Sequence, residues 1–97
     1  MIKNYLAEGE YHQYLSLGRD IAGRRQMLVH GLEWQAEHAK THLESPADTL
    51  RMRAMIDELE TVEKQLEAVL AKLNTAANEA GLNTLTRTAL AQPVTKV

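Results

Sequence analysis

Two histidines spaced four residues apart are the side chains in this sequence best suited to metal chemistry. On a helix, His38 and His42 would share one face with Glu37 close by, and such a pair can hold zinc or another divalent ion. A catalytic zinc ion needs a third protein ligand, for which Asp48 is the obvious candidate, and neither a His-Glu-x-x-His nor a Glu-x-x-His motif occurs on the helices expected below. We therefore interpret the pair as solvated side chains and expect no cofactor. A site completed at a dimer axis by the same pair from a second chain stays open as an alternative.

Other catalytic arrangements find little support in the sequence. The chain has no cysteine, which excludes thiolate zinc sites and thiol nucleophiles. There is no glycine-rich phosphate loop and no Ser-His-Asp set placed on turns. A group of glutamates should form a charged outer helix face, with no cleft to perturb their pKa values: Glu58, Glu60, Glu63 and Glu67. We expect a protein that is not an enzyme.

The arginines fall into two groups, and acidic residues stand close to both. The groups are Arg19, Arg24, Arg25 and Arg51, Arg53, in a chain whose net charge is −2. Binding of nucleic acid favours a continuous basic stripe or stacking aromatics, so we interpret the arginines as solvated salt-bridge partners. The alternative is a small dimeric nucleic-acid-associated regulator of phage or plasmid type, in which two copies bring the separated groups onto one surface.

Nothing in the hydropathy pattern predicts a membrane protein. The first ten residues have no long apolar core, and no run approaches the roughly 20 apolar residues that a membrane span requires. We expect a cytoplasmic protein with no membrane partner.

The strongest structural pattern is an alternating three-and-four spacing of apolar residues between positions 52 and 76, a run without Gly or Pro. This spacing is a heptad seam that requires a partner helix. The residues are Met52, Met55, Leu59, Val62, Leu66, Val69, Leu73 and Ala76.

A rougher helical pattern precedes this seam and supplies its partner. Its apolar residues are Tyr14, Leu17, Ile21, Leu28, Leu32, Ala36, Ala39 and Leu43. Between the two patterns, Ser45 is a candidate N-cap and Pro46 fits the first helical position. After the second pattern, Gly81 is a candidate left-handed C-cap. We predict an N-terminal arm (1–10), a helical hairpin (11–81) with helices at about 11–43 and 46–80, and a flexible or weakly helical C-terminal tail (82–97). Facing residues of the hairpin should have numbers that add to about 91, with Arg25 pairing outward with Glu63 or Glu67.

A second apolar face on the first helix predicts an interface. Met27 and Trp34 lie seven residues apart on the side away from the seam, and we assign the partner-binding residues as Gly23, Met27, His30, Gly31 and Trp34. A lone hairpin of 97 residues is thin, so self-association is favoured. The predicted fold is all-α, with two long helices in an antiparallel coiled-coil-like hairpin that dimerises into a four-helix bundle. The predicted function is that of a non-enzymatic interaction module, adaptor or chaperone-like, whose partner is itself or another helical protein.

Overall fold

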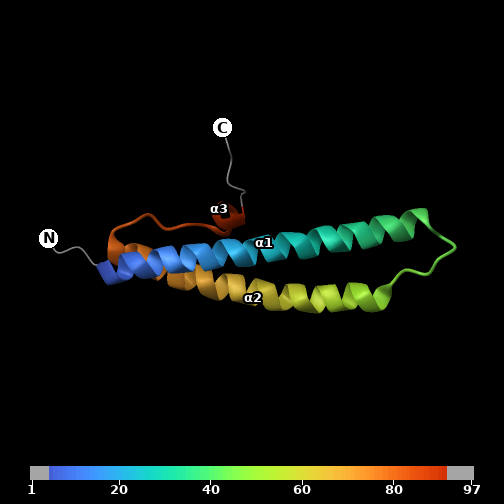
Figure 1. Cartoon of the computed structure of the whole chain (residues 1–97), viewed down its shortest axis with the longest axis horizontal. Coiled ribbons are helices and arrows are strands. Elements are labelled where there is room, and N and C mark those ends of the chain that lie inside the picture. Colours follow the sequence, from blue (N-terminus) through green and yellow to red (C-terminus); the bar gives the residue numbers. More distant parts are fainter. Residues whose placement is uncertain (1–4, 92–97) are drawn as a thin grey trace, which may run out of the picture.

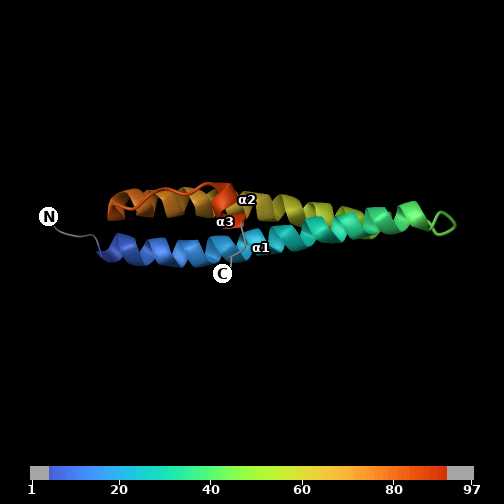
Figure 2. The same ribbon diagram turned by 90° about the horizontal axis from the view of Figure 1, so that it is seen from above.

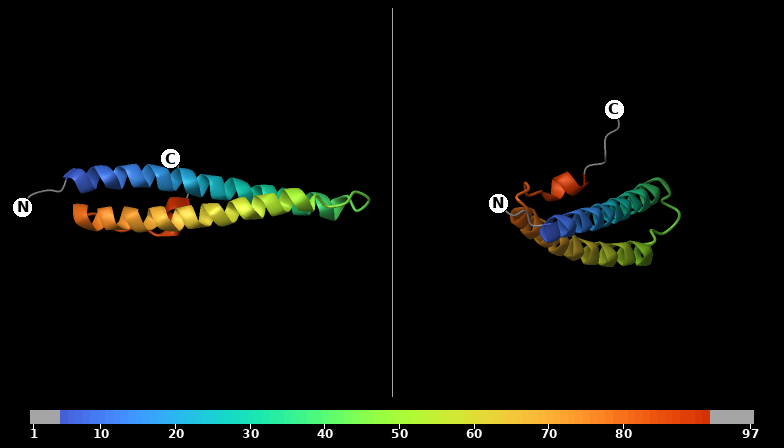
Figure 3. Two further views of the ribbon diagram at one scale, coloured as in Figure 1. Left: turned by 90° about the horizontal axis from the view of Figure 1, so that it is seen from below. Right: turned by 60° about the vertical axis from the view of Figure 1, so that its left-hand side comes forward.

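The computed structural model describes residues 5–91 of the chain as two long antiparallel helices and one short one (Figure 1). Helix α1 covers Tyr5–Thr41, α2 covers Thr49–Ala80 and α3 covers Arg87–Ala91. The described residues contain no strand. Figures 2 and 3 show that the long helices cross at a small angle toward the connecting loop. The predicted all-α helical hairpin is therefore confirmed.

The seam predicted on α2 is the side of that helix that contacts α1. Five of its residues are buried, namely Val62, Leu66, Val69, Leu73 and Ala76, and the other three, Met52, Met55 and Leu59, are half-buried. Because three-and-four spacing keeps these side chains on one face of a helix, a single neighbouring helix can cover them all.

The predicted face of α1 is confirmed in part, because five of its eight residues are half-buried: Tyr14, Ile21, Leu28, Leu32 and Ala39. Leu17, Ala36 and Leu43 are exposed, whereas the buried residues of this helix are Ala7, Gly18, Ala22 and Gln35. The prediction followed the larger apolar side chains and missed that small residues of α1 take the most buried positions beside half-buried large ones such as Tyr14 and Ile21. At Gly18 the missing side chain makes room for Leu90 of α3, since a β-carbon built there would lie only 3.2 Å from its Cδ1 atom.

The pairing of the two helices also differs from the prediction. Gly31 lies against Met55, and Gly18 lies against Val69, so facing residues have numbers that add to 86 and 87 rather than 91. The helices are therefore offset by about one helical turn from the predicted register.

Both ends of the hairpin turn were predicted within a few residues, but with the wrong cap. Residues 42–48 connect the helices, and Asp48, not Ser45, is the N-cap: its Oδ1 atom accepts the Arg51 backbone N–H at 3.0 Å. Helix α2 then begins after Pro46 rather than at it. A carboxylate satisfies the free N–H groups of the first turn and also favours the positive end of the helix dipole.

The C-cap of α2 is confirmed. Gly81 has a φ of 74°, and it is followed by the backbone hydrogen bond from Leu82 N–H to the Ala77 carbonyl at 2.7 Å. This left-handed conformation favours glycine, and the pair of bonds from residues 81 and 82 forms a Schellman motif.

The N-terminal arm predicted for residues 1–10 is not separate where the structure describes it. Residues 5–10 continue α1 without a break, and Gly9 does not interrupt the helix. Residues 1–4 lie outside the described part of the chain.

The segment after α2 folds back along the hairpin, as Figure 2 shows, and ends in α3 against α1. The Asn74 side chain holds this segment: its Nδ2 donates to the Leu85 carbonyl at 2.9 Å, and its Oδ1 accepts the Leu85 N–H at 2.8 Å. Leu90 is then 3% exposed, in a cluster with Ala22 and Leu66. Residues 82–91 were predicted as part of a flexible or weakly helical tail. Their last five residues are helical, and the rest of that predicted tail, 92–97, lies outside the described residues.

Candidate functional site

Four of the five predicted partner-binding residues share the outer side of α1. They form what we call the outer stripe: Gly23, Met27, His30 and Trp34. Their spacing of four, three and four residues keeps them on one helix face. Met27 is 75% exposed and Trp34 is 61% exposed, although both are large and apolar. The outer stripe is therefore an apolar surface that α2 and α3 leave uncovered.

Gly31, the fifth predicted residue, is turned toward α2. A β-carbon built on it would lie 2.8 Å from Cε of Met55, so the methionine side chain already occupies the space beside this glycine. Gly23 differs, because a β-carbon built there would meet no atom within 4 Å. Only Gly23 offers open space for a partner.

His30 belongs to the outer stripe by spacing but is occupied locally. Its Nδ1 lies 3.1 Å from Oε1 of Glu33 on the same helix, and both side chains are exposed. It also borders a hollow on the α1 surface that neither Met27 nor Trp34 lines. His30 is thus less directly connected to the apolar residues of the outer stripe than the sequence suggests.

A ladder of stacked rings continues from Trp34 toward the loop. The Trp34 and His38 rings are 5.0 Å apart at 14°, and the His38 and His42 rings are 4.1 Å apart at 17°. The Nδ1 atom of His42 donates to the His38 carbonyl oxygen at 3.1 Å. Within residues 5–91, no group of three His, Cys, Asp or Glu side chains is placed to hold a metal ion. In one chain the two histidines therefore remain a pair without a third ligand.

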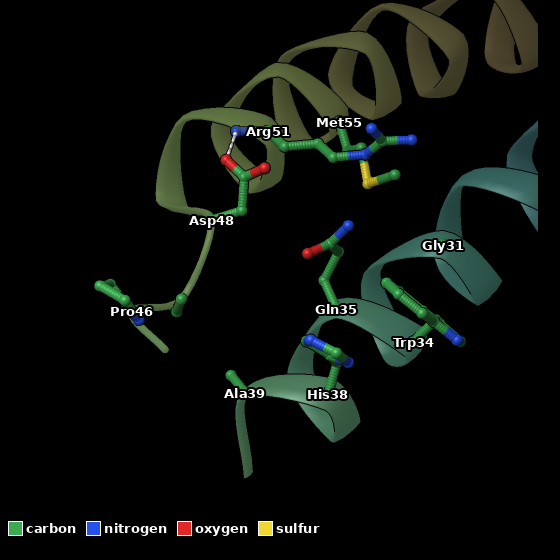
Figure 4. A pocket seen from close by; sticks show the side chains of 10 residues that line it. Gly31, Trp34, Gln35, His38, Ala39, Pro46, Asp48, Arg51 and Met55 are labelled. Atoms are coloured by element: carbon green, nitrogen blue, oxygen red, sulfur yellow. Dashed lines mark hydrogen bonds between the residues drawn. The ribbon is translucent and has the colours of Figure 1, made fainter. Parts of the chain in front are cut away.

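The space between the helix ends forms what we call the loop-end hollow, with a volume of about 470 Å³. Figure 4 shows Trp34, Gln35 and His38 of α1 on one side, and Arg51 and Met55 of α2 on the other. Asp48 closes the end nearest the loop. Trp34 belongs both to this hollow and to the outer stripe.

The residue that sequence reasoning missed is Gln35. It is 9% exposed and is the polar residue that lies buried among the described positions. Position 35 has the helical spacing of the inward-facing, half-buried residues Leu28, Leu32 and Ala39. A glutamine, however, is ordinarily assigned to the solvent side of a helix. A polar residue inside an apolar repeat was the available signal.

The arginines in the middle of the hairpin are paired with glutamates. Arg24 pairs with Glu58, and Arg25 Nε donates to Glu63 at 3.0 Å, as predicted for Arg25. Arg87 of α3 pairs with the same Glu63 and, at 3.2 Å, with a second glutamate on α2. Partial burial by itself raises the pKa of Glu63, but the hydrogen bonds and charges of Arg25 and Arg87 outweigh burial and hold that pKa below its ordinary value. Acidic partners thus neutralise this basic group.

No protein family, curated protein sequence or solved structure matches the chain. In the described part of the chain, no helix is long and apolar enough to cross a membrane.

Proposed function

We propose that this protein is a non-enzymatic helical interaction module that associates with a second copy of itself through the outer stripe of α1. The observation that supports the proposal is the exposure of Met27 and Trp34, seven residues apart on one helix face. Burying a large apolar side chain contributes about 1.5–3 kcal/mol. Two such residues from each copy would give a symmetric interface a substantial apolar centre.

Gly23 supports the same arrangement. It lies four residues before Met27 with open space beside its backbone, so side chains of a second helix can approach closely there. In a symmetric dimer, each copy would offer both the open position and the large side chains. Four long helices would then form a bundle, which also provides the thin hairpin with a second covered face.

The neutralised arginines give no support to the alternative of a nucleic-acid-associated regulator. Arg24, Arg25 and Arg87 have carboxylate partners at Glu58, Glu63 and Glu67. A phosphate backbone would have to compete with these ion pairs. The prediction of salt bridges is wrong for the other arginines of the two groups, because Arg19, Arg51 and Arg53 form no ion pair within residues 5–91.

Sedimentation equilibrium over a range of protein concentrations tests the proposal. We expect the parent protein to dimerise, and Trp34→Ala and Met27→Ala each to raise the dissociation constant at least about tenfold, because each removes most of a large apolar contact. Leu50→Ala is the matched control, since Leu50 is 77% exposed but lies on α2, away from the outer stripe. A parent protein that stays monomeric, or a Trp34→Ala variant that dimerises as the parent does, would refute self-association through this face.

A further inference from the structure

The side chain of Gln35 lies between the two long helices, and its amide has no hydrogen-bond partner among the described residues. The residue is 9% exposed. Figure 4 shows this amide extending from α1 toward Arg51 and Met55, into the loop-end hollow. The amide is therefore available to form a hydrogen bond with a ligand in the hollow.

The dimensions and walls of the loop-end hollow suit a small molecule. Its volume of about 470 Å³ lies within the roughly 300–1,000 Å³ typical of ligand sites. Trp34 and the Met55 thioether provide apolar walls from the two helices, and a methionine side chain adapts its shape readily. An apolar or aromatic body would therefore fit against these two residues.

The charges around the hollow favour an anion. The Arg51 guanidinium extends over the hollow beside Met55, and in the described structure it has no carboxylate partner. Asp48 is the acidic residue of the lining, and its Oδ1 atom already accepts the Arg51 backbone N–H at 3.0 Å. The first turn of the 32-residue helix α2 adds the positive end of a helix dipole. A free guanidinium next to an unpaired amide is a recognition pair for a carboxylate.

We propose that the loop-end hollow is a binding site for a small organic carboxylate that carries an apolar body. The carboxylate pairs with Arg51 and accepts a hydrogen bond from Nε2 of Gln35, while the apolar body lies against Trp34 and Met55. The two proposals share Trp34, but the polar contacts of this site, Gln35 and Arg51, are not part of the outer stripe, so the site does not require self-association.

The only tryptophan in the sequence lies in this hollow and so reports binding directly. We would titrate the protein with 4-phenylbutyrate, record Trp34 fluorescence, and confirm the heat of binding by calorimetry. The neutral analogue 4-phenylbutyramide is the ligand control, because it keeps the apolar body and removes the charge. We expect saturable binding of the carboxylate, with the amide at least about tenfold weaker. Absence of saturation by the carboxylate, or equal affinity for both compounds, would overturn the proposal.

Three variants separate the proposed contacts from general effects on folding. Arg51→Gln should weaken 4-phenylbutyrate binding at least about tenfold, whereas Arg53→Gln, on the same exposed helix end but outside the hollow, should leave it unchanged. Gln35→Leu should also weaken 4-phenylbutyrate binding, because it removes the second hydrogen bond to the carboxylate. Equal losses in the two arginine variants, or a Gln35→Leu protein that binds 4-phenylbutyrate as tightly as the parent, would show that these residues are not a ligand site.

The oligomeric state distinguishes the two proposals. Met27→Ala is expected to weaken dimerisation but to leave probe affinity unchanged, since Met27 does not line the loop-end hollow. If Met27→Ala weakens binding of the probe as much as it weakens dimerisation, the hollow is not an independent site and the proposal fails.

Discussion

Gly23 offers a substitution that should stabilise the helix and weaken the proposed interface at the same time. It lies within α1 with an ordinary helical backbone, since Gly81 is the residue with positive φ in the described chain. A β-carbon added at Gly23 would meet no atom within 4 Å, so Gly23→Ala should carry no steric cost in the monomer. Replacing glycine by alanine inside a helix contributes about 0.8–1 kcal/mol. For a domain of this size, that corresponds to roughly 4–8 °C in melting temperature.

The same methyl group should have the opposite effect on association. Gly23 is the position of the outer stripe where a second helix can approach most closely, and a β-carbon would hold the two backbones apart. Gly9→Ala is the matched control, because Gly9 lies on the same helix, also has no atom within 4 Å of a built β-carbon, and is far from Met27 and Trp34. We expect both variants to gain similar stability as monomers, and only Gly23→Ala to dimerise more weakly.

Urea unfolding followed by circular dichroism, at a protein concentration below the dissociation constant, measures the first effect, and sedimentation equilibrium measures the second. If Gly23→Ala unfolds at lower urea than the parent, the assumption of an open, unstrained helical position is wrong. If it is more stable but dimerises as tightly as Gly9→Ala, Gly23 lies outside the interface.

Two further predictions concern the docking of α3. Leu90→Ala should destabilise the protein by about 2–5 kcal/mol at most, because Leu90 is 3% exposed and fills the space beside Gly18. The loss of stability is smaller if α3 detaches from the hairpin, and hydrogen exchange of the α3 amides would reveal such detachment. An unchanged melting temperature with protected α3 amides would contradict this packing. Because the pKa of Glu63 is lowered in the folded state, the ionised carboxylate stabilises the fold at pH values above 4.5, the ordinary pKa of this group. This contribution is lost as the pH falls through the folded-state pKa. Glu63→Gln should therefore reduce the drop in urea midpoint between pH 5 and pH 3, and a drop as large as in the parent would show that the pairs with Arg25 and Arg87 do not act in solution.

The fold of α2 was predictable because one physical rule decides it. The eight seam residues from Met52 to Ala76 keep one spacing, and most of the residues between them are charged or polar, with Ile56 and Leu70 as the large apolar exceptions. No other face of this helix has apolar residues at so regular a spacing, and all eight predicted seam residues are buried or half-buried.

The face of α1 was harder to predict because size and hydrophobicity did not decide it. Leu17 remains exposed, while its small neighbour Gly18 faces inward and receives Leu90. That choice depends on α3, which comes more than sixty residues later in the sequence and is held in place by the Asn74 side chain. Contacts of this kind leave no trace in the periodicity of a single helix, and the one-turn offset of the hairpin follows from them and from the Gly31–Met55 contact.

The unequal distribution of buried residues relates the fold to both proposals. In α2, every buried side chain lies at Val62 or beyond, in the part of the hairpin where α1 and α3 both contribute to the core. Between Met27 and Leu59, the buried residue is the polar Gln35, and the seam residues around it are only half-buried. This loop-end part has little apolar burial to oppose local opening, so it should be the first part of the hairpin to exchange its amide hydrogens. Both the loop-end hollow and Trp34 lie there, and either a carboxylate ligand or a second copy would add contacts where the single chain has fewest. Because a ligand that binds only the folded state stabilises it in proportion to its occupancy, such binding should slow amide exchange most strongly in this part of the hairpin.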